Sequence, residues 1–380
     1  MIRIAPLLLA AISTVTVLAT TAEAEQPPRI EVCFVLDTTG SMGGLIEGAK
    51  AKIWSIANQM IEAKPTPRLS IALVGYRDRG DDYITTVFDL TEDIDAVYAN
   101  LHGFQADGGG DTPESVNQAL HEAVTDISWS QDRDILKIIF LVGDCPPHMD
   151  YSDDVKYPET CQAAVRKDLI INTVQCGSHE PTVPIWQEIA RLAEGSYVAI
   201  GQTGDMQVIT TPFDSRLSEL NASLGTTVVA YGRDEVKRSV RAKQMAAEAA
   251  PAPTMADRLV YNAKTGMVVQ GGGDLVKDLD DGTVKLEELA EDELPDELRE
   301  LGAAEREQVI KEKAAQRQQI QTEINDLLKK RQGFIDAETA RLAREGKGLA
   351  FDVKVNEMLR EQALRKGLTY ESESSSGGTE

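Results

Sequence analysis

The feature that most constrains the fold is the alternation of short apolar runs with amphipathic runs between Arg29 and about Thr226. The apolar runs are rich in β-branched residues, as strands buried on both faces of a sheet are. They lie at residues 30–36, 69–76, 84–90, 136–143, 169–177 and 196–200. Strands that alternate with helical runs form a mostly parallel sheet covered on both faces, so we expect a doubly wound α/β domain with six strands. The turn-forming segment YRDRGDDY at 76–83 makes the third strand the expected antiparallel edge.

Three loops rich in oxygen-bearing side chains follow predicted strands. The first run ends in Asp37, with Thr39 and Ser41 just after it. Thr112 lies in the glycine-rich loop ADGGGDTPES, where it is the expected N-cap of a helix whose first residue is Pro113. Asp144 ends the fourth run. Because ligands bind outside the carboxyl ends of the strands in such a sheet, we expect these five side chains to meet at one place.

This ordered set resembles the metal-ion-dependent adhesion site of the von Willebrand factor A domain. Asp37, Thr39 and Ser41 match its Asp-x-Ser/Thr-x-Ser element. Thr112 matches its second-loop threonine and Asp144 its third-loop aspartate. The resemblance covers about 200 residues. It departs from the usual pattern where Thr39 replaces the commoner serine, and where Cys145-Pro146-Pro147 follows the third-loop aspartate in place of the usual glycine.

The chemistry of these side chains points to a divalent cation. Hydroxyls and carboxylates are hard oxygen ligands that suit Mg²⁺, with Mn²⁺ or Ca²⁺ as alternatives. Only Asp37 and Asp144 carry charge, so the ion keeps an open, electropositive position for a carboxylate from a protein partner. The simpler alternative for the stretch from Asp37 to Ser41 is a plain strand-to-helix turn, since these residue types also cap helices.

Other acidic side chains give weaker signals. Asp78 and Asp107 are candidates to support the site, but solvated turn acids are the favoured interpretation. His148 and the aspartates after it are interpreted in the same way. We expect no enzyme, because the sequence holds neither an HExxH zinc helix nor a GxSxG nucleophile elbow. A hydrolase built on Asp37 and Asp144 is the third hypothesis.

The amino-terminal segment indicates the compartment of the mature protein. Residues 1–24 have an early arginine, an apolar stretch and an Ala-Glu-Ala site, the layout of a secretory signal peptide. We therefore expect an exported bacterial chain, periplasmic or secreted, with no membrane insertion after cleavage. The formal net charge of −23 argues against nucleic acid as a partner, because nucleic acids select basic surfaces.

Export would permit a disulfide among four cysteines. Cys33 lies within the central strand and is expected to be a buried thiol. Cys145, Cys161 and Cys176 gather near one edge of the sheet, so adjacency alone does not choose a pair. We favour Cys161 with Cys176, because that bridge leaves Cys145 free beside Asp144.

The rest of the chain predicts further segments. After the α/β domain at 25–226 we expect a linker and a small strand-containing segment at 227–283, since residues 241–254 are rich in Ala and Pro. A mainly helical region at 284–368 follows, and 369–380 form a disordered tail. Within the helical region, the amphipathic run from about Pro295 to Arg344 predicts a long helix or a helical hairpin, and its apolar stripe leaves self-association as a coiled coil open. The first functional hypothesis is metal-dependent capture of an acidic group on a protein partner, and the alternative is an envelope scaffold or assembly factor acting through the helical region.

Overall fold

The computed structural model describes residues 27–110, 112–345 and 351–370. The predicted signal peptide at 1–24 lies outside the described residues, as do ten of the twelve residues assigned to the tail. Within the described ranges, no helix combines the length and apolarity needed to cross a bilayer.

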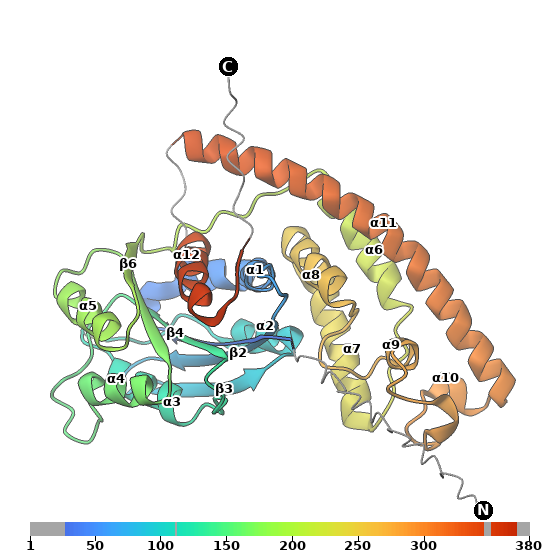
Figure 1. Ribbon diagram of the computed structural model, residues 1–380, viewed down its shortest axis with the longest axis horizontal. Helices are drawn as coiled ribbons and strands as arrows, with labels where there is room; N and C mark the ends of the chain where they lie inside the picture. The colour runs from blue at the N-terminus through green and yellow to red at the C-terminus, as the bar shows by residue number, and fades with distance from the viewer. Residues whose placement is uncertain (1–26, 111, 346–350, 371–380) are drawn as a thin grey trace, which may run out of the picture.

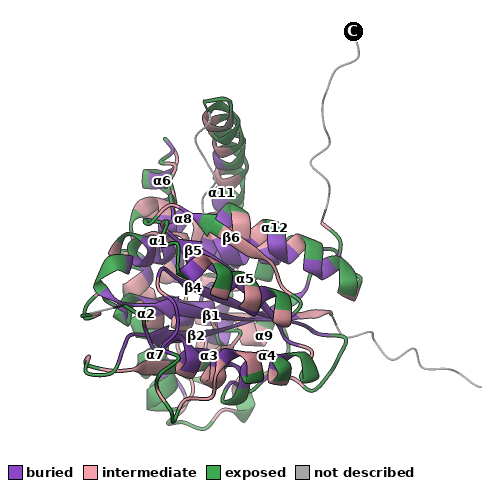
Figure 2. Cartoon of the chain, turned by 90° about the vertical axis from the view of Figure 1, so that its left-hand side faces the viewer, coloured by how far each residue is buried: buried purple, intermediate pink, exposed green. Residues whose placement is uncertain are grey.

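The sheet has six strands in the order β3-β2-β1-β4-β5-β6. All neighbours pair in parallel except β2 and β3, so the expected antiparallel edge strand is confirmed. The bounds are β1 (Arg29–Asp37), β2 (Arg68–Tyr76), β3 (Thr85–Thr91), β4 (Leu136–Gly143), β5 (Ile170–Cys176) and β6 (Tyr197–Ile200). Figure 2 shows β1, β2, β4 and β5 buried at the centre, whereas the edge strands β3 and β6 are only partly buried.

Alternate residues of each strand feed two separate cores. In β1, Val32 and Phe34 face one core while Cys33 and Val35 face the other, as the period of two along a strand requires. The first core is covered by α1 (Gly43–Met60), reached through the short turn η1 (Gly40–Met42), and by α2 (Ile94–Gly103). The second is covered by α3 (Val116–Thr125), α4 (Tyr157–Arg166) and α5 (Thr182–Leu192). The predicted doubly wound fold is therefore confirmed.

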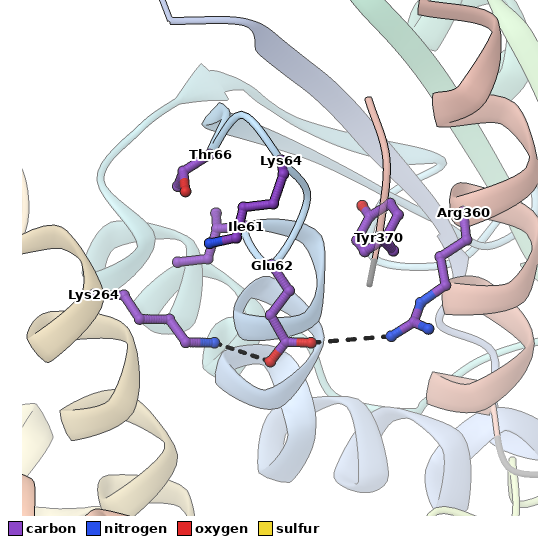
Figure 3. Close-up of a pocket in the computed structure, with 7 residues that line it drawn as sticks. All are labelled: Ile61, Glu62, Lys64, Thr66, Lys264, Arg360 and Tyr370. Carbon is purple, nitrogen blue, oxygen red and sulfur yellow. Dashed lines mark hydrogen bonds and ion pairs between the residues drawn. The ribbon is translucent and has the colours of Figure 1, made fainter. Parts of the chain in front are cut away.

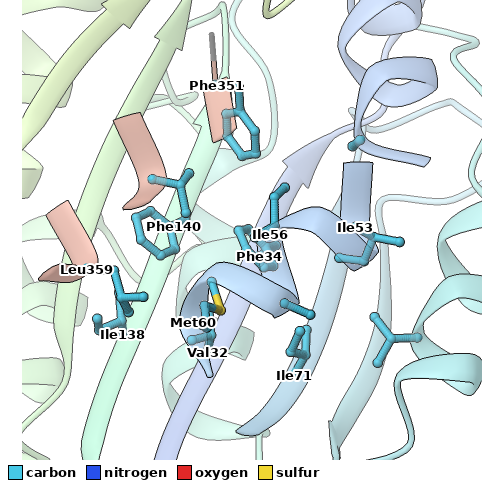
Figure 4. Packing of buried hydrophobic residues seen from close by; sticks show 14 of the residues in the cluster. Val32, Phe34, Ile53, Ile56, Met60, Ile71, Ile138, Phe140, Phe351 and Leu359 are labelled. Carbon is cyan, nitrogen blue, oxygen red and sulfur yellow. The ribbon is translucent and has the colours of Figure 1, made fainter. Parts of the chain in front are cut away.

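The covering of the first core is completed by a helix from the far end of the chain. Helix α12 (Phe351–Ala363), followed by η3 (Leu364–Lys366), packs beside α1 and contacts β4. The ring centroids of Phe351 and Phe34 are 6.4 Å apart, and the Phe34 ring stacks on that of Phe140 with 5.5 Å between the centroids (Figure 4). Helix α12 thus belongs to the sheet domain, and the predicted boundaries of 25–226 and 284–368 are wrong at this point.

The residues between β6 and α12 form a helical unit beside the sheet domain (Figure 1). It contains α6 (Asp214–Gly225), α7 (Asp234–Ala249), α8 (Ala252–Thr265), α9 (Leu275–Asp280), η2 (Leu286–Glu288), α10 (Asp296–Arg299) and α11 (Ala303–Arg344). The predicted long helix is confirmed as α11, which has 42 residues. Its apolar residues Ile320, Ile324 and Leu327 pack within the unit's own core. Self-association through this helix stays a prediction.

The expected linker and small strands at 227–283 are wrong. The Ala-rich segment forms parts of α7 and α8, with Pro251 at the cap between them. Alanine has the highest intrinsic helix propensity, and proline is tolerated at the start of a helix, so this composition favours two helices as much as a linker. Between residues 227 and 283, the described backbone shows one isolated bridge, Ala230 with Asp274, and no strand.

The favoured disulfide is also wrong, because all four cysteines are free. Cys161 packs in the core under α3, α4 and α5, whereas Cys176 packs in the core under α1 and α12. The sheet lies between the two thiols. Cys176 ends its strand with its side chain on the face opposite Cys161, a consequence of strand register that sequence adjacency did not reveal.

Candidate metal centre

The five predicted side chains all lie at the carboxyl edge of the sheet. Asp37 is the last residue of β1, and Thr39 and Ser41 follow in the turn that leads into α1. Asp144 follows β4, the neighbour of β1, and Thr112 lies in the loop before α3. The structure therefore brings the three predicted loops together.

Close packing sets Asp37 against the end of β4. A Cβ placed on Gly143 would lie 3.1 Å from Asp37 Oδ2 and 2.3 Å from the hydroxyl of Tyr76. A side chain at position 143 would therefore clash, and glycine lets the ends of the strands approach. Tyr76, the last residue of β2, is the strand partner of Asp37, and its buried hydroxyl has no hydrogen-bond partner among the described residues.

The carboxylate of Asp37 is buried and half satisfied. Its Oδ1 accepts hydrogen bonds from the backbone N–H of Thr39 at 2.9 Å and from the Thr39 hydroxyl at 2.7 Å. Its Oδ2 is buried without a hydrogen-bond partner in the described part of the chain. Burial raises the pKa of Asp37 to about 7, opposed by the Thr39 hydroxyl and reinforced by the charge of Asp144. A cation beside Asp37 Oδ2 would therefore be stabilised.

Asp144 has the same character. Its Oδ2 accepts a hydrogen bond from Gln202 Nε2 at 2.7 Å, while its buried Oδ1 has no partner among the residues described. Gln202, just beyond β6, also donates to the backbone carbonyl of Ser41 at 3.3 Å and so ties the first and third loops together. Sequence reasoning missed Gln202, although its place after the carboxyl end of the sixth strand was the available signal.

The hydroxyls of Ser41 and Thr112 line the outer side of the site, whereas Thr39 is buried. Thr39 Oγ1 lies 3.4 Å from Ser41 Oγ, and Ser41 is exposed. Thr112 is exposed too, with its Oγ1 3.8 Å from Cys145 Sγ. The expectation that Thr112 caps a helix is wrong, because α3 begins at Val116 with Ser115 at its N-cap. The Thr112 hydroxyl is therefore not committed to a helix terminus.

Glu114 is a further acidic residue that sequence reasoning missed. It is 2% exposed, and its Oε2 has no hydrogen-bond partner in the described ranges. Burial raises the pKa of Glu114 to about 9, with smaller contributions from nearby carboxylates, Asp37 first. A Cβ placed on Gly109 would lie 2.8 Å from Thr39 Cβ and 3.1 Å from Glu114 Oε1, so this glycine keeps the loop against both side chains.

Asp78 is hydrogen-bonded to the end of the loop that carries Thr112. It is buried, and its Oδ1 accepts a hydrogen bond from Ser115 at 2.7 Å while its Oδ2 accepts one from Tyr151 at 2.9 Å. His148 Nε2 lies 3.4 Å from the same Oδ2. The interpretation of Asp78 and His148 as solvated turn residues is therefore wrong, whereas Asp107 is exposed as a turn acid would be.

The donor set fits a divalent cation that prefers oxygen. Two buried carboxylate oxygens, one on Asp37 and one on Asp144, lack hydrogen-bond donors among the described residues, and such groups are costly unless a positive charge compensates them. No cluster of three His, Cys, Asp or Glu side chains that could hold a metal occurs among the described residues. The hydroxyls of Thr39, Ser41 and Thr112 could complete such a site together with the carboxylates, and this set suits Mg²⁺ or Ca²⁺.

Comparison with known proteins places the domain. The family model described as von Willebrand factor A domain matches residues 31–195. The von Willebrand factor A domain-containing protein 7 of Rattus norvegicus is 38% identical over 97 residues, which cover 26% of this chain and 10% of that protein. A putative ariadne-like RING finger protein of Acanthamoeba polyphaga mimivirus is 22% identical over 234 residues, or 56% of this chain and 22% of that protein. The chain thus spans about a tenth to a fifth of the length of these curated relatives.

Two solved structures are similar to part of the chain. Proximal thread matrix protein 1 from the mussel byssus, in a structure with a zinc-occupied MIDAS motif, has a TM-score of 0.36 and 14% identity, covering 46% of this chain and 42% of that one. The VWA domain of SpRpn10 has a TM-score of 0.36 and 16% identity, covering 46% of this chain and 89% of that one. With the family match and the six-stranded sheet, residues 31–195 are shown to form a von Willebrand factor A domain.

Proposed function

We propose that this chain is a non-enzymatic binding protein that captures an acidic group of a protein partner through a divalent cation. The ion, Mg²⁺ in the first instance, is held by five side chains at the carboxyl edge of the sheet: Asp37, Thr39, Ser41, Thr112 and Asp144. The observation that carries the proposal is a pair of buried carboxylate oxygens, on Asp37 and Asp144, at the ends of neighbouring strands, for which the described part of the chain offers no hydrogen-bond donor.

The placement of the hydroxyls supports an open coordination position. Asp37 is fully buried and Asp144 is 8% exposed, whereas Ser41 and Thr112 are exposed. The two charged ligands and Thr39, which is 2% exposed, therefore lie on the inner side of the site, and Ser41 and Thr112 lie on the solvent side. Mg²⁺ keeps several waters when proteins bind it. A partner carboxylate that replaces one of these waters completes the shell with a charged oxygen.

The von Willebrand factor A fold is consistent with protein binding. We further propose that the chain acts outside the cytoplasm, which rests on the signal-peptide pattern of residues 1–24 alone. The scaffold hypothesis is not favoured, because the apolar stripe of α11 is already packed against its own helical unit.

Isothermal titration with Mg²⁺ and with Mn²⁺ tests the site. We expect the wild-type chain to bind one ion and Asp37→Ala to bind none while its far-ultraviolet circular dichroism is unchanged. Asp292→Asn is the matched control, because Asp292 is exposed and lies in the helical unit. Undiminished ion binding by Asp37→Ala would contradict the assignment of the site.

Partner capture is tested by a pull-down from envelope extract with wild type and Asp37→Ala, each with Mg²⁺ and with EDTA. We expect proteins that are retained only by the wild type in Mg²⁺. Retention that is equal in all four conditions would contradict capture through the ion.

A further inference from the structure

A second site lies at the opposite edge of the sheet from the candidate metal centre. A pocket of about 400 Å³ forms where three segments distant in sequence meet (Figure 3). Its polar lining comes from the connection between α1 and β2, from α8, and from α12 and the segment after it: Glu62, Lys64, Thr66, Lys264, Arg360 and Tyr370. The connection precedes β2, so the pocket lies at the amino edge of the parallel strands.

The charge of this pocket is opposite to that of the chain. It is lined by three cationic side chains and one carboxylate, an excess of two positive charges in a chain of net charge −23. Glu62 lies between two of the cations, with its Oε1 3.0 Å from Lys264 Nζ and its Oε2 4.0 Å from the guanidinium of Arg360. The side chain of Lys64 has no ion pair in the described part of the chain. The lining is therefore under-neutralised.

Donors remain free to hold an anion. Lys264 donates to Glu62 and, at 3.2 Å, to the carbonyl of Asn58, which leaves its third N–H uncommitted. Arg360 uses its Nε on Asn356 at 3.3 Å, and its guanidinium lies 5.0 Å from the centre of the Tyr370 ring. Tyr370 donates its own hydroxyl to the carbonyl of Met60, and burial raises its pKa, so the ring stays neutral beside an anion.

We propose that this pocket binds a small dianion, of the phosphate monoester or dicarboxylate class. The volume lies within the range of small-molecule sites. Two negative charges match the two unneutralised cations, and ammonium and guanidinium groups both bind oxyanions well. Because the cations come from the connection before β2, from α8 of the helical unit and from α12, the dianion joins three segments that are distant in sequence. This site is independent of the candidate metal centre.

The test is titration of the full chain with inorganic phosphate and with succinate at constant ionic strength, with chloride as the screening control. We expect saturable binding of one dianion per chain. Saturation by phosphate alone or by succinate alone identifies the class, and either result supports the proposal. Saturation by neither up to about 10 mM, well beyond ordinary metabolite affinities, overturns it.

Three variants assign the binding to the pocket. Lys64→Ala is expected to weaken binding about fivefold to tenfold, the effect of one charge at close range in water. Glu62→Gln is expected to strengthen it, because the competing carboxylate is removed. Lys329→Ala, also an exposed lysine, is the matched control. Equal affinities of wild type, Lys64→Ala and Glu62→Gln would overturn the pocket as the binding site. Asp37→Ala keeps dianion binding, which separates this test from that of the metal centre.

Discussion

Replacing Asp37 by asparagine is expected to stabilise the metal-free protein at pH 8 and to remove its response to Mg²⁺. Asparagine keeps an Oδ1 that can accept both hydrogen bonds from Thr39. It replaces the Oδ2 that lacks a donor with an N–H group beside the carboxylate of Asp144. The variant therefore relieves the two unfavourable features of the metal-free site, a buried charge and its repulsion by Asp144.

The size follows from the pKa of Asp37, which burial raises from 3.8 to about 7. A difference of about three pKa units corresponds to about 4 kcal/mol at 1.36 kcal/mol per unit, an order-of-magnitude upper bound. The folded state binds this proton more tightly than the unfolded state does. The contribution to stability is therefore fully present below pH 3.8 and is lost as the pH rises through about 7. At pH 8 the wild type lacks it.

Urea denaturation at pH 5 and pH 8 in EDTA measures the effect, with Asp292→Asn as the control. The free energy of unfolding of Asp37→Asn is expected to exceed that of the wild type by up to about 4 kcal/mol at pH 8, and by less at pH 5. Mg²⁺ at a hundredfold excess over its dissociation constant adds about 2.7 kcal/mol to the wild type and nothing to the variant. A variant that is less stable than the wild type at pH 8 in EDTA would refute the reasoning.

Three further predictions concern the rest of the chain. Arg258→Ala is expected to lower the free energy of unfolding by about 3–5 kcal/mol, because it removes the cation that pairs with the buried carboxylate of Asp95. In the wild type, the guanidinium donates to the two oxygens of Asp95 at 2.6 and 2.8 Å. Urea denaturation measures the change, and a loss below about 1 kcal/mol would contradict the prediction. Leu359→Ala is expected to cost about 2–5 kcal/mol by the same assay, whereas Leu364→Ala, at a residue 61% exposed, should stay within about 0.5 kcal/mol; similar losses would show that α12 is not docked as described. Protein that is unfolded without reductant is expected to react with a thiol reagent at all four cysteines, and a mass consistent with a disulfide would count against the free thiols.

The sheet and the five candidate ligands were predictable because local patterns specify them. The run from Ile30 to Leu36 is apolar at nearly every position, as expected of a strand covered on both faces. Parallel order then places Asp37 and Asp144 at one edge without further information. These inferences need only residue type and the direction of the strands.

What the sequence left open depends on contacts between distant residues. Phe351 lies in the region predicted to be helical, but the sequence around it does not show that it packs against Phe34 rather than against the preceding helices. Glu114 and Gln202 are ordinary polar residues in sequence. Glu114 lies at the site because Gly109 packs against it, and Gln202 reaches Asp144 because it follows the end of β6. The Ala- and Pro-rich stretch at 241–254 has the composition of both a linker and a pair of helices, and burial of Ala247 and Thr254 decides between them.

The position of α12 has a consequence for the order of folding during synthesis. Phe351 follows Phe34 by more than 300 residues, and the whole helical unit is made between β6 and α12. At roughly 5–20 residues per second, a ribosome takes roughly 8 to 30 seconds to pass from Ile200 to Phe351. Throughout that interval the core that contains Phe34 and Phe140 has α1 and α2 in place but lacks α12, the last helix that covers it. The helical unit can thus form while the sheet domain is still open, and the domain that begins first is the last to close.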